Sequence, residues 1–259
     1  MRAICFWQRA SSLIRTSPLS GDDVYDMGYL PEERGLYKKM KVGEQAIYLA
    51  ELKGIKKAEA QKRLKVWFDK FEIGGWWDKK VEELSKGMQQ KVQFITTVIH
   101  EPDILIFDEP FSGFDPINAN LLKDTILELR DKGATILLST HNMASVEELC
   151  DSITLINKGK SILQGRVGDI KRQHDTHKRE IIIRTNDPQP IYALGDTYNN
   201  IRVEPTDIHD EVKLTTYSES PNEMLSQLMQ IGELVSYKEV LPSMNDIFIQ
   251  EVQSQNQAS

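Results

Sequence analysis

Acidic side chains and a histidine follow two apolar runs of the sequence, where they could act on a phosphate group. Asp108 and Glu109 come directly after residues 104–107, and His141 follows a second such run at residues 134–139. If both runs are strands of one parallel sheet, their carboxyl ends share the edge where ligands bind. There Asp108 can hold Mg²⁺ through water, Glu109 can polarise the water that attacks a γ-phosphate, and His141 can contact that phosphate. The alternative is a solvated strand end without a catalytic role.

A second candidate is the helix start at residues 84–88, which read Leu-Ser-Lys-Gly-Met. The first N–H groups of a helix have no partner within it, and the helix dipole is positive at that end, so anions bind there. Gly87 would let the backbone approach a ligand closely. Taken alone, the same residues equally describe an ordinary helix start capped by Ser85.

Alternating helices and strands must position these residues. Apolar periodicity and turn signals predict helices at 42–52, 57–71, 85–100 and 116–130, buried strands at 104–107 and 134–139, and a hairpin of residues 153–156 and 161–163. Asp115 is the expected N-cap of the fourth helix, with Pro116 in its first turn. Strand, helix and strand in this order predict an α/β sandwich with a mostly parallel sheet.

A smaller unit is expected after a polar and charged linker at residues 169–179. Its predicted strands lie near 180–184, 201–204, 212–217 and 235–241, and its predicted helices start at Pro221 and run over 243–252. Ser220 and Glu223 have the spacing of a capping box. His174 and His177 could in principle bind a metal, but no Cys or carboxylate pattern accompanies them, so a solvated linker is the favoured interpretation. Residues 1–27 show neither periodicity and are assigned no fold.

Composition excludes several classes of protein. The 259 residues carry a net charge of −7, so there is no general basic field for nucleic acid or an anionic membrane surface. Two cysteines are too few for a disulfide framework, which favours a reducing compartment and the cytosol. No apolar run approaches the roughly 20 residues of a membrane-spanning helix, and Gln8 and Arg9 interrupt the apolar start before an export signal could form.

The order of these segments resembles the ATP-binding subunits of ABC transporters. In that family residues 84–88 would be the signature motif, 104–110 the Walker B strand with its catalytic Glu, 112–115 the D-loop and 139–141 the H-loop. The resemblance implies that Glu109 and His141 are catalytic and that Asp108 holds Mg²⁺. It also implies contacts with ATP, partly across a subunit interface, from Ser85, Lys86, Gly87, Met88 and Asp115.

Residues 28–35 look like the family's Q-loop, which links the nucleotide to a helical subdomain that grips the membrane partner. Glu32 stands where the family has glutamine, and its carboxylate could still meet Mg²⁺ through water. The alternative is a plain proline turn at Pro31. The segment 241–248 resembles the extra C-terminal unit of ABC-2-type exporters of the sodium- or drug-efflux sort.

One required motif is missing from these 259 residues. A P-loop NTPase needs Gly-x-x-x-x-Gly-Lys-Ser/Thr between a strand and a helix, because that backbone and Lys cradle the phosphates. The only Gly-Lys-Ser is at residues 159–161, in the predicted hairpin turn and without the first glycine, so it is not expected to bind phosphate. The simplest hypothesis is a truncated or altered version of a normal ATPase, with the change upstream of Gly28.

These observations predict a P-loop NTPase-like sandwich with a small second domain. The expected division is an unassigned or altered segment at 1–27, an incomplete ABC ATPase domain at 28–168 with a helical subdomain at about 38–100, a linker at 169–179, a small α+β domain at 180–252 and a tail at 253–259. The implied function is an ATP-hydrolysing subunit that energises export through a separate transmembrane permease. It would act as a homodimer or heterodimer at the inner face of the cell membrane, without nucleic acid.

Two alternatives stay open. The first is a non-hydrolysing subunit that supplies the signature motif to an intact partner, or serves only assembly. The second is a soluble ABC protein of translation or repair, although such proteins usually carry two cassettes in one chain, and the acidic balance also argues against this class.

Overall fold

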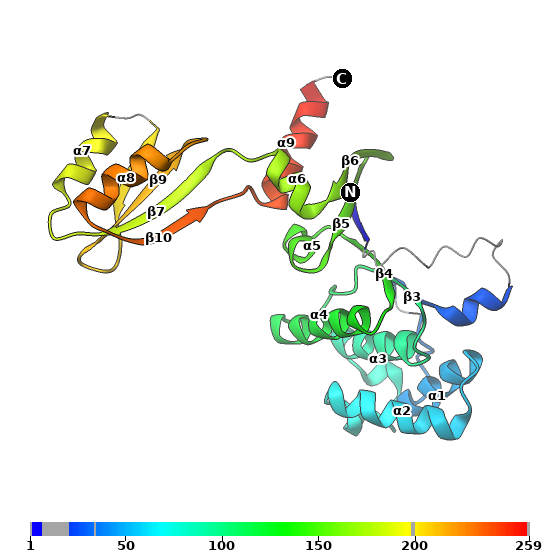
Figure 1. The fold of residues 1–259 in the computed structure, drawn as a ribbon. Coiled ribbons are helices and arrows are strands. Elements are labelled where there is room, and N and C mark those ends of the chain that lie inside the picture. Colours follow the sequence, from blue (N-terminus) through cyan, green and yellow to red (C-terminus); the bar gives the residue numbers. More distant parts are fainter. Residues whose placement is uncertain (1, 7–20, 34, 198–199, 258–259) are drawn as a thin grey trace. The chain divides into compact units, whose positions relative to one another are not determined.

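The computed structural model describes residues 2–6, 21–33, 35–197 and 200–257, in two compact units, Met1–Val167 and Gly168–Ser259 (Figure 1). The division falls one residue before the boundary expected from the sequence. The predicted linker at 169–179 is wrong, because α6 (Val167–Gln173) covers its first part and β7 begins at Lys178. Val167 and Ile170 bury one face of α6, and two apolar residues among many charged ones are too weak a signal for a helix.

Among the described helices, none is long and apolar enough to cross a bilayer.

A six-stranded sheet of order β2-β3-β4-β1-β5-β6 forms the centre of the first unit. Besides β1, which is described below, the sheet consists of β2 (Met27–Leu30), β3 (Ile104–Asp108), β4 (Thr135–Thr140), β5 (Ser152–Asn157) and β6 (Lys160–Arg166). β3 pairs in parallel with β2 and β4. Leu105 and Phe107 of β3 are fully buried, which is why the strand is a continuous apolar run. The predicted α/β class is therefore confirmed. The expected mostly parallel sheet is wrong, because three of the five strand pairings in this sheet are antiparallel.

β1 (Arg2–Phe6) lies between β4 and β5 and runs antiparallel to both. The expectation that residues 1–27 have no regular structure is therefore wrong for β1 and for the 3₁₀ helix η1 (Gly21–Asp26), while residues 7–20 lie outside the described part of the chain. Five residues are too few to show a period, and the neighbouring strands supply the pairing that local sequence cannot reveal. Ala3 pairs with Thr140, so the amino end of β1 lies at the edge where β4 ends.

Helices surround this sheet and form a subdomain beside it. Their bounds are α1 (Val42–Leu52), α2 (Lys57–Lys70), α3 (Lys86–Val98), α4 (Pro116–Asp131) and α5 (Met143–Leu149). Aromatic rings connect the subdomain to the sheet in one continuous series, with centroid distances of 6.1 Å for Trp67–Phe71, 5.7 Å for Phe71–Phe94 and 5.6 Å for Phe94–Phe107. Tilted pairs at such distances add to the stabilisation from buried area. The series fixes α2 and α3 against β3.

The second unit has the order strand, helix, strand, strand, helix, strand. Its elements are β7 (Lys178–Arg184), α7 (Gln189–Thr197), β8 (Ile201–Pro205), β9 (Glu211–Tyr217), α8 (Asn222–Ile231) and β10 (Glu233–Glu239). The antiparallel sheet has the order β10-β7-β9-β8, which makes the unit ferredoxin-like (Figure 1). Its core consists of Ile181, Ile183, Ile191, Val212, Leu214 and Leu228.

This unit contains one helix that was not predicted and lacks one predicted cap. No periodicity indicated α7, which contains Pro190 and Gly195; a Cβ on Gly195 would lie 2.9 Å from the Val203 side chain, so close packing on β8 explains the glycine. The capping box of Ser220 and Glu223 is not formed, because α8 starts one residue later with Pro221 as N-cap and no side-chain cap.

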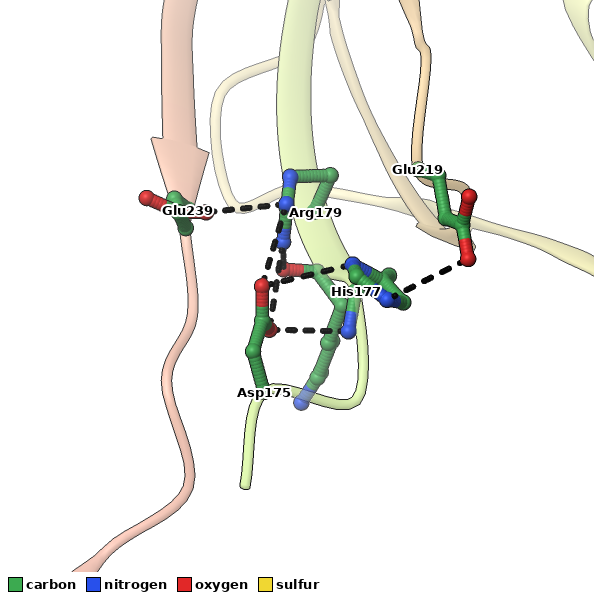
Figure 2. A network of polar contacts seen from close by, with 6 residues as sticks. Asp175, His177, Arg179, Glu219 and Glu239 are labelled. Atoms are coloured by element: carbon green, nitrogen blue, oxygen red, sulfur yellow. Dashed lines mark hydrogen bonds and ion pairs between the residues drawn. The ribbon is translucent and has the colours of Figure 1, made fainter. Parts of the chain in front are cut away.

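Polar contacts fasten the segments at one end of the ferredoxin-like sheet (Figure 2). The buried Arg179 guanidinium lies 2.8 Å from a Glu239 carboxylate oxygen and 3.3 Å from one of Asp175. His177 lies between Asp175, at 3.4 Å, and Glu219, at 3.6 Å. Two carboxylates compensate the charge that Arg179 brings into the interior. His177 therefore belongs to a structural network, and in the described residues no three potential ligands gather to hold a metal.

His174 also departs from the expected solvated linker, because it packs between α6 and α9 (Met244–Gln257). Its Nδ1 lies 2.9 Å from the Ile170 carbonyl oxygen and its Nε2 lies 2.9 Å from Glu251 Oε1. An imidazole can donate from both nitrogens only when it is protonated. The hydrogen bond to Glu251 accordingly raises the pKa of His174 above its ordinary value.

We expect the attachment of α9 to weaken as the pH rises. Because the folded pKa of His174 is raised, its stabilising effect is complete below the unfolded pKa and is lost as the pH rises through the folded value. Hydrogen exchange in residues 244–254, corrected for intrinsic rates, should show less protection at about pH 8.5 than at about pH 5.5. The variant Glu251→Gln should lose most of this pH dependence and Glu204→Gln should keep it; the same dependence in both variants would contradict the assignment.

A second prediction concerns the close contact between Gly43 of α1 and the indole of Trp77. A Cβ on Gly43 would lie 2.4 Å from the ring, whereas a Cβ on Gly75 would meet nothing within 4 Å. Gly43→Ala should lower the free energy of unfolding by about 1–3 kcal/mol, and Gly75→Ala should change it by less than about 0.5 kcal/mol. Urea unfolding followed by tryptophan fluorescence measures this, since Trp67, Trp76 and Trp77 all lie in the first unit. Equal midpoints for the two variants would show the contact to be unimportant.

Candidate functional site

The carboxyl ends of β3 and β4 meet at one edge of the sheet. Asp108 pairs with Ser139 in parallel register, so the residues that follow the two strands come together. Glu109 Oε1 lies 2.6 Å from His141 Nδ1. The structure thus joins the two side chains that the sequence identified as candidate catalytic groups, although 31 residues separate them.

Glu109 carries a buried carboxylate with several donors. Its side chain is 8% exposed, whereas that of His141 is 76% exposed. The backbone N–H of His141 donates to Oε1 at 2.9 Å, and the Thr140 hydroxyl donates to Oε2 at 3.3 Å. A buried carboxylate is stable only when such donors replace water. With Nδ1 of His141 donating to Glu109, Nε2 is the ring nitrogen that the exposed imidazole offers to a ligand.

The backbone at Glu109 adopts a conformation that is unusual for a residue with a side chain. Its φ of +48° lies in the left-handed region, and Pro110 follows directly. Its N–H donates to the Ser139 carbonyl at 2.9 Å and its carbonyl accepts from Ser112 at 3.1 Å, so both neighbouring segments hold it in place. Such strain costs about 1–3 kcal/mol and clusters at functional sites. The turn aims the carboxylate toward His141 instead of along the strand.

Asp108 and Glu32 are the candidate metal ligands. Asp108 is half-buried, and its Oδ1 accepts a hydrogen bond from the Ser139 hydroxyl. A single carboxylate beside a hydroxyl suits Mg²⁺, which keeps several waters and takes its other ligands from phosphates. Leu30 of β2 pairs with Phe107, so the loop carrying Glu32 starts at this same edge. That Glu32 would bind Mg²⁺ remains a prediction.

The helix start at residues 85–88 lies beside the loop that follows Glu109. Ser85 is the N-cap of α3, as predicted, and its Oγ accepts from the Met88 N–H at 3.3 Å. A Cβ on Gly87 would lie 3.0 Å from the Gly113 carbonyl oxygen, so a larger residue would push the two segments apart. Ser85 and Lys86 are exposed and accessible to a ligand or a second subunit. The nucleotide contacts implied for this turn stay predictions.

Asp115 caps the N-terminus of α4. Oδ1 accepts from the N–H groups of Ile117 and Asn118, both at 3.1 Å, and Oδ2 accepts from the Asn118 side chain. Hydrogen bonds from Asn118 lower the pKa of Asp115. The predicted N-cap is confirmed, and its carboxylate is engaged in capping rather than directed at Glu109 or His141.

Neither the described strand β1 nor the Gly-Lys-Ser triplet at residues 159–161 begins a phosphate loop at this edge. β1 is antiparallel to β4, so its carboxyl end, from which such a loop would start, faces the opposite edge. The Gly-Lys-Ser triplet lies in the β5–β6 hairpin, where Lys158 and Gly159 have φ of +49° and +75° and Asn157 pairs with Lys160. Two positive φ values are typical of a two-residue hairpin turn. The predicted position of the triplet in a hairpin turn is confirmed; that it does not bind phosphate stays a prediction.

Sequence reasoning missed two residues that support the site. Thr140 is 1% exposed and bridges Glu109 to the Asn142 N–H, which donates to its Oγ1 at 3.1 Å. Gln90 of α3 is also buried, and its amide donates to the Pro110 carbonyl at 3.5 Å. The position of Thr140, directly before the candidate histidine, was the available signal; Gln90 gave none because its partner is 20 residues away.

A groove of about 280 Å³ opens between β2, α1 and α3. Most of its lining is apolar, and Tyr29 and Leu52 are more than half exposed. Lys53 borders the groove and donates to the carbonyls of Val24 and Met27 at 2.7 and 2.9 Å. Gln93 donates to the carbonyls of Pro31 and Glu33, at 3.5 and 3.3 Å, so the loop around Glu32 is attached to the same groove.

Comparison with protein families gives a match in each unit. Residues 21–112 match the model of the ABC transporter family. Residues 165–252 match the model described as ATP-binding protein DrrA1-3-like, C-terminal domain. The first match includes the helix start at 85–88 together with Asp108 and Glu109.

Individual relatives agree with these models. An uncharacterized ABC transporter ATP-binding protein of Bacillus subtilis, YhaQ, is 44% identical over 227 residues, which cover 87% of this chain and 74% of that protein. A fluoroquinolones export ATP-binding protein of Mycobacterium tuberculosis is 44% identical over 82 residues, or 32% of this chain and 27% of that protein. A solved structure of the ATP-binding subunit of an ABC transporter has a TM-score of 0.55 and 34% identity, and the match covers 59% of this chain and 65% of that one.

Thr140 offers a test of how the candidate site is held. Thr140→Val keeps the shape but removes the hydroxyl that links Glu109 to the Asn142 N–H, and should destabilise the first unit by about 1–3 kcal/mol. Thr140→Ser keeps the hydroxyl and should preserve the linkage. Hydrogen exchange at the amides of His141 and Asn142 should accelerate in the valine variant only. Equal acceleration in both variants would assign the effect to the lost methyl packing instead.

Proposed function

Because this chain belongs to the family of ABC transporter ATP-binding subunits, we propose that it couples ATP to export through a separate transmembrane permease subunit. The buried Glu109 carboxylate, held by His141 and Thr140 at the carboxyl edge of the sheet, is the observation that carries this proposal. The second unit and the fluoroquinolones export relative support export as the direction of transport.

In this proposal each residue at this edge has a separate role in hydrolysis. Glu109 orients the attacking water and takes up its proton as the oxygen bonds to the γ-phosphorus and the bond to ADP breaks. The exposed Nε2 of His141 contacts the γ-phosphate and stabilises its charge. Asp108 fits Mg²⁺, which when bound neutralises charge on the β- and γ-phosphates. The strained turn keeps Glu109 in position without any movement at the moment of reaction.

The phosphate cradle is the part that these 259 residues do not supply. They contain no Gly-x-x-x-x-Gly-Lys-Ser/Thr, and β1 directs its carboxyl end away from the edge that holds Glu109. This observation favours a second candidate function, in which the chain hydrolyses nothing itself. The exposed turn at Ser85 and Gly87 then completes a site for nucleotide held by an intact partner subunit.

We assign the groove between β2, α1 and α3 to the membrane partner. An apolar groove with exposed Tyr29 and Leu52 suits an apolar face of a permease segment. Gln93 lines this groove and bonds the loop that carries Glu32, so a partner seated there would act on a loop that starts at the catalytic edge. This placement makes the protein peripheral at the inner face of the membrane, and the permease determines the substrate.

ATPase measurements on two preparations separate the two candidate functions. The chain alone should release phosphate at the background rate, because it lacks a cradle for the triphosphate. Mixed with an ABC subunit that has a phosphate loop but an inactivated signature turn, it should restore hydrolysis. Gly87→Asp should abolish that rescue through clash with the Gly113 carbonyl and added negative charge, whereas Glu109→Gln should leave it intact. Turnover by the chain alone that disappears in Glu109→Gln would instead establish it as a complete ATPase.

A further inference from the structure

We propose that the second unit binds a small organic amine in a cavity between its two helices and the ends of β8 and β9. The cavity has a volume of about 190 Å³. Among the described residues its lining combines three apolar and six polar ones, which are Leu194, Ile201, Met224, Asn200, Thr216, Ser218, Ser220, Glu223 and Gln227. This site is separate from the ATP-dependent function proposed above and does not depend on it.

Thr216 of β9 is the buried polar group that points to a ligand. The residue is 1% exposed and lines the cavity. Its hydroxyl makes no hydrogen bond to a described residue, and it pairs with Ile201 of β8 through the backbone. The hydroxyl oxygen is not among the fully buried polar atoms that lack a partner, so it can bond a water or a ligand group in the cavity. In this cavity the ligand would provide that partner.

Ser220 and Glu223 reach the cavity because α8 does not use them. Their spacing suits a capping box, yet Pro221 is the N-cap of α8 and no side chain caps the helix. Both side chains therefore line the cavity and are exposed to it and to solvent. Among the described residues of the lining Glu223 is the one with a charge, and its carboxylate favours a cation over an anion.

The remaining walls define the class of ligand. Leu194, Ile201 and Met224 form an apolar surface that also packs against the core of the unit. An apolar cavity of about 150 Å³ is known to accept one benzene ring, so this volume suits a single ring or an equivalent aliphatic body. The geometry fits an ammonium group against Glu223, the apolar body against these three side chains, and a polar substituent near Thr216.

Benzylamine is a suitable probe, with benzyl alcohol and benzoate as neutral and anionic controls of the same shape. In amide NMR spectra of the full chain, benzylamine should cause saturable shifts at Thr216, Ser218 and Glu223. Glu223→Gln should weaken its binding about tenfold, equivalent to about 1.4 kcal/mol. Thr216→Val should weaken ligands that carry a second polar group more than benzylamine itself. Asp207→Asn, which removes the same charge from the β8–β9 turn outside the cavity, should leave binding unchanged.

Three outcomes would overturn the proposal. Benzoate could bind as tightly as benzylamine, Glu223→Gln could bind benzylamine like the original chain, or no probe could give a saturable shift, which would mean that the cavity holds only water. Circular dichroism shows whether each variant is folded. Because the measurement needs neither nucleotide nor permease, its failure would leave the proposed ATP-dependent function untouched.

Discussion

Packing of Phe94 against Phe107 is the contact on which the geometry of the first unit depends, because it fixes α3 to β3, the middle one of the three parallel strands. The same helix begins at Ser85, carries Gln90 beneath the turn after Glu109, and holds the loop around Glu32 through Gln93. One rigid helix therefore positions three loops that are far apart in sequence. Helix–sheet packing of this kind converts a hydrophobic contact into a precise arrangement of polar groups.

The carboxyl edge of β3 and β4 holds the proposed catalytic groups in defined positions. Glu109 has donors for both carboxylate oxygens, and its strained backbone is held from two sides. In the described part of the chain no phosphate loop joins these groups, since β1, beside β4, runs in the opposite direction. The two proposed functions therefore differ in the subunit that would bind the nucleotide.

Local signals made part of this structure predictable. The apolar runs at β3 and β4 and the caps at Ser85 and Asp115 depend on a few neighbouring residues, and each lies where the sequence indicated. The position of β1 could not be predicted because its partners are more than 100 residues away. The predicted cap of α8 is wrong because the helix starts one residue later than expected. Ser220 and Glu223 then no longer occupy the N-cap and N3 positions that a capping box needs. The pairing of Glu109 with His141 was expected from strand order, but its 2.6 Å contact required the left-handed turn.

The ferredoxin-like unit has its first and last strands, β7 and β10, paired side by side. The chain therefore enters and leaves the unit at neighbouring points, where Arg179 joins Asp175 and Glu239, and the flanking helices α6 and α9 meet through His174 and Glu251. In topology the unit is an insertion between these two helices. Its exchange for another domain would therefore need cuts at only two adjacent points of the chain.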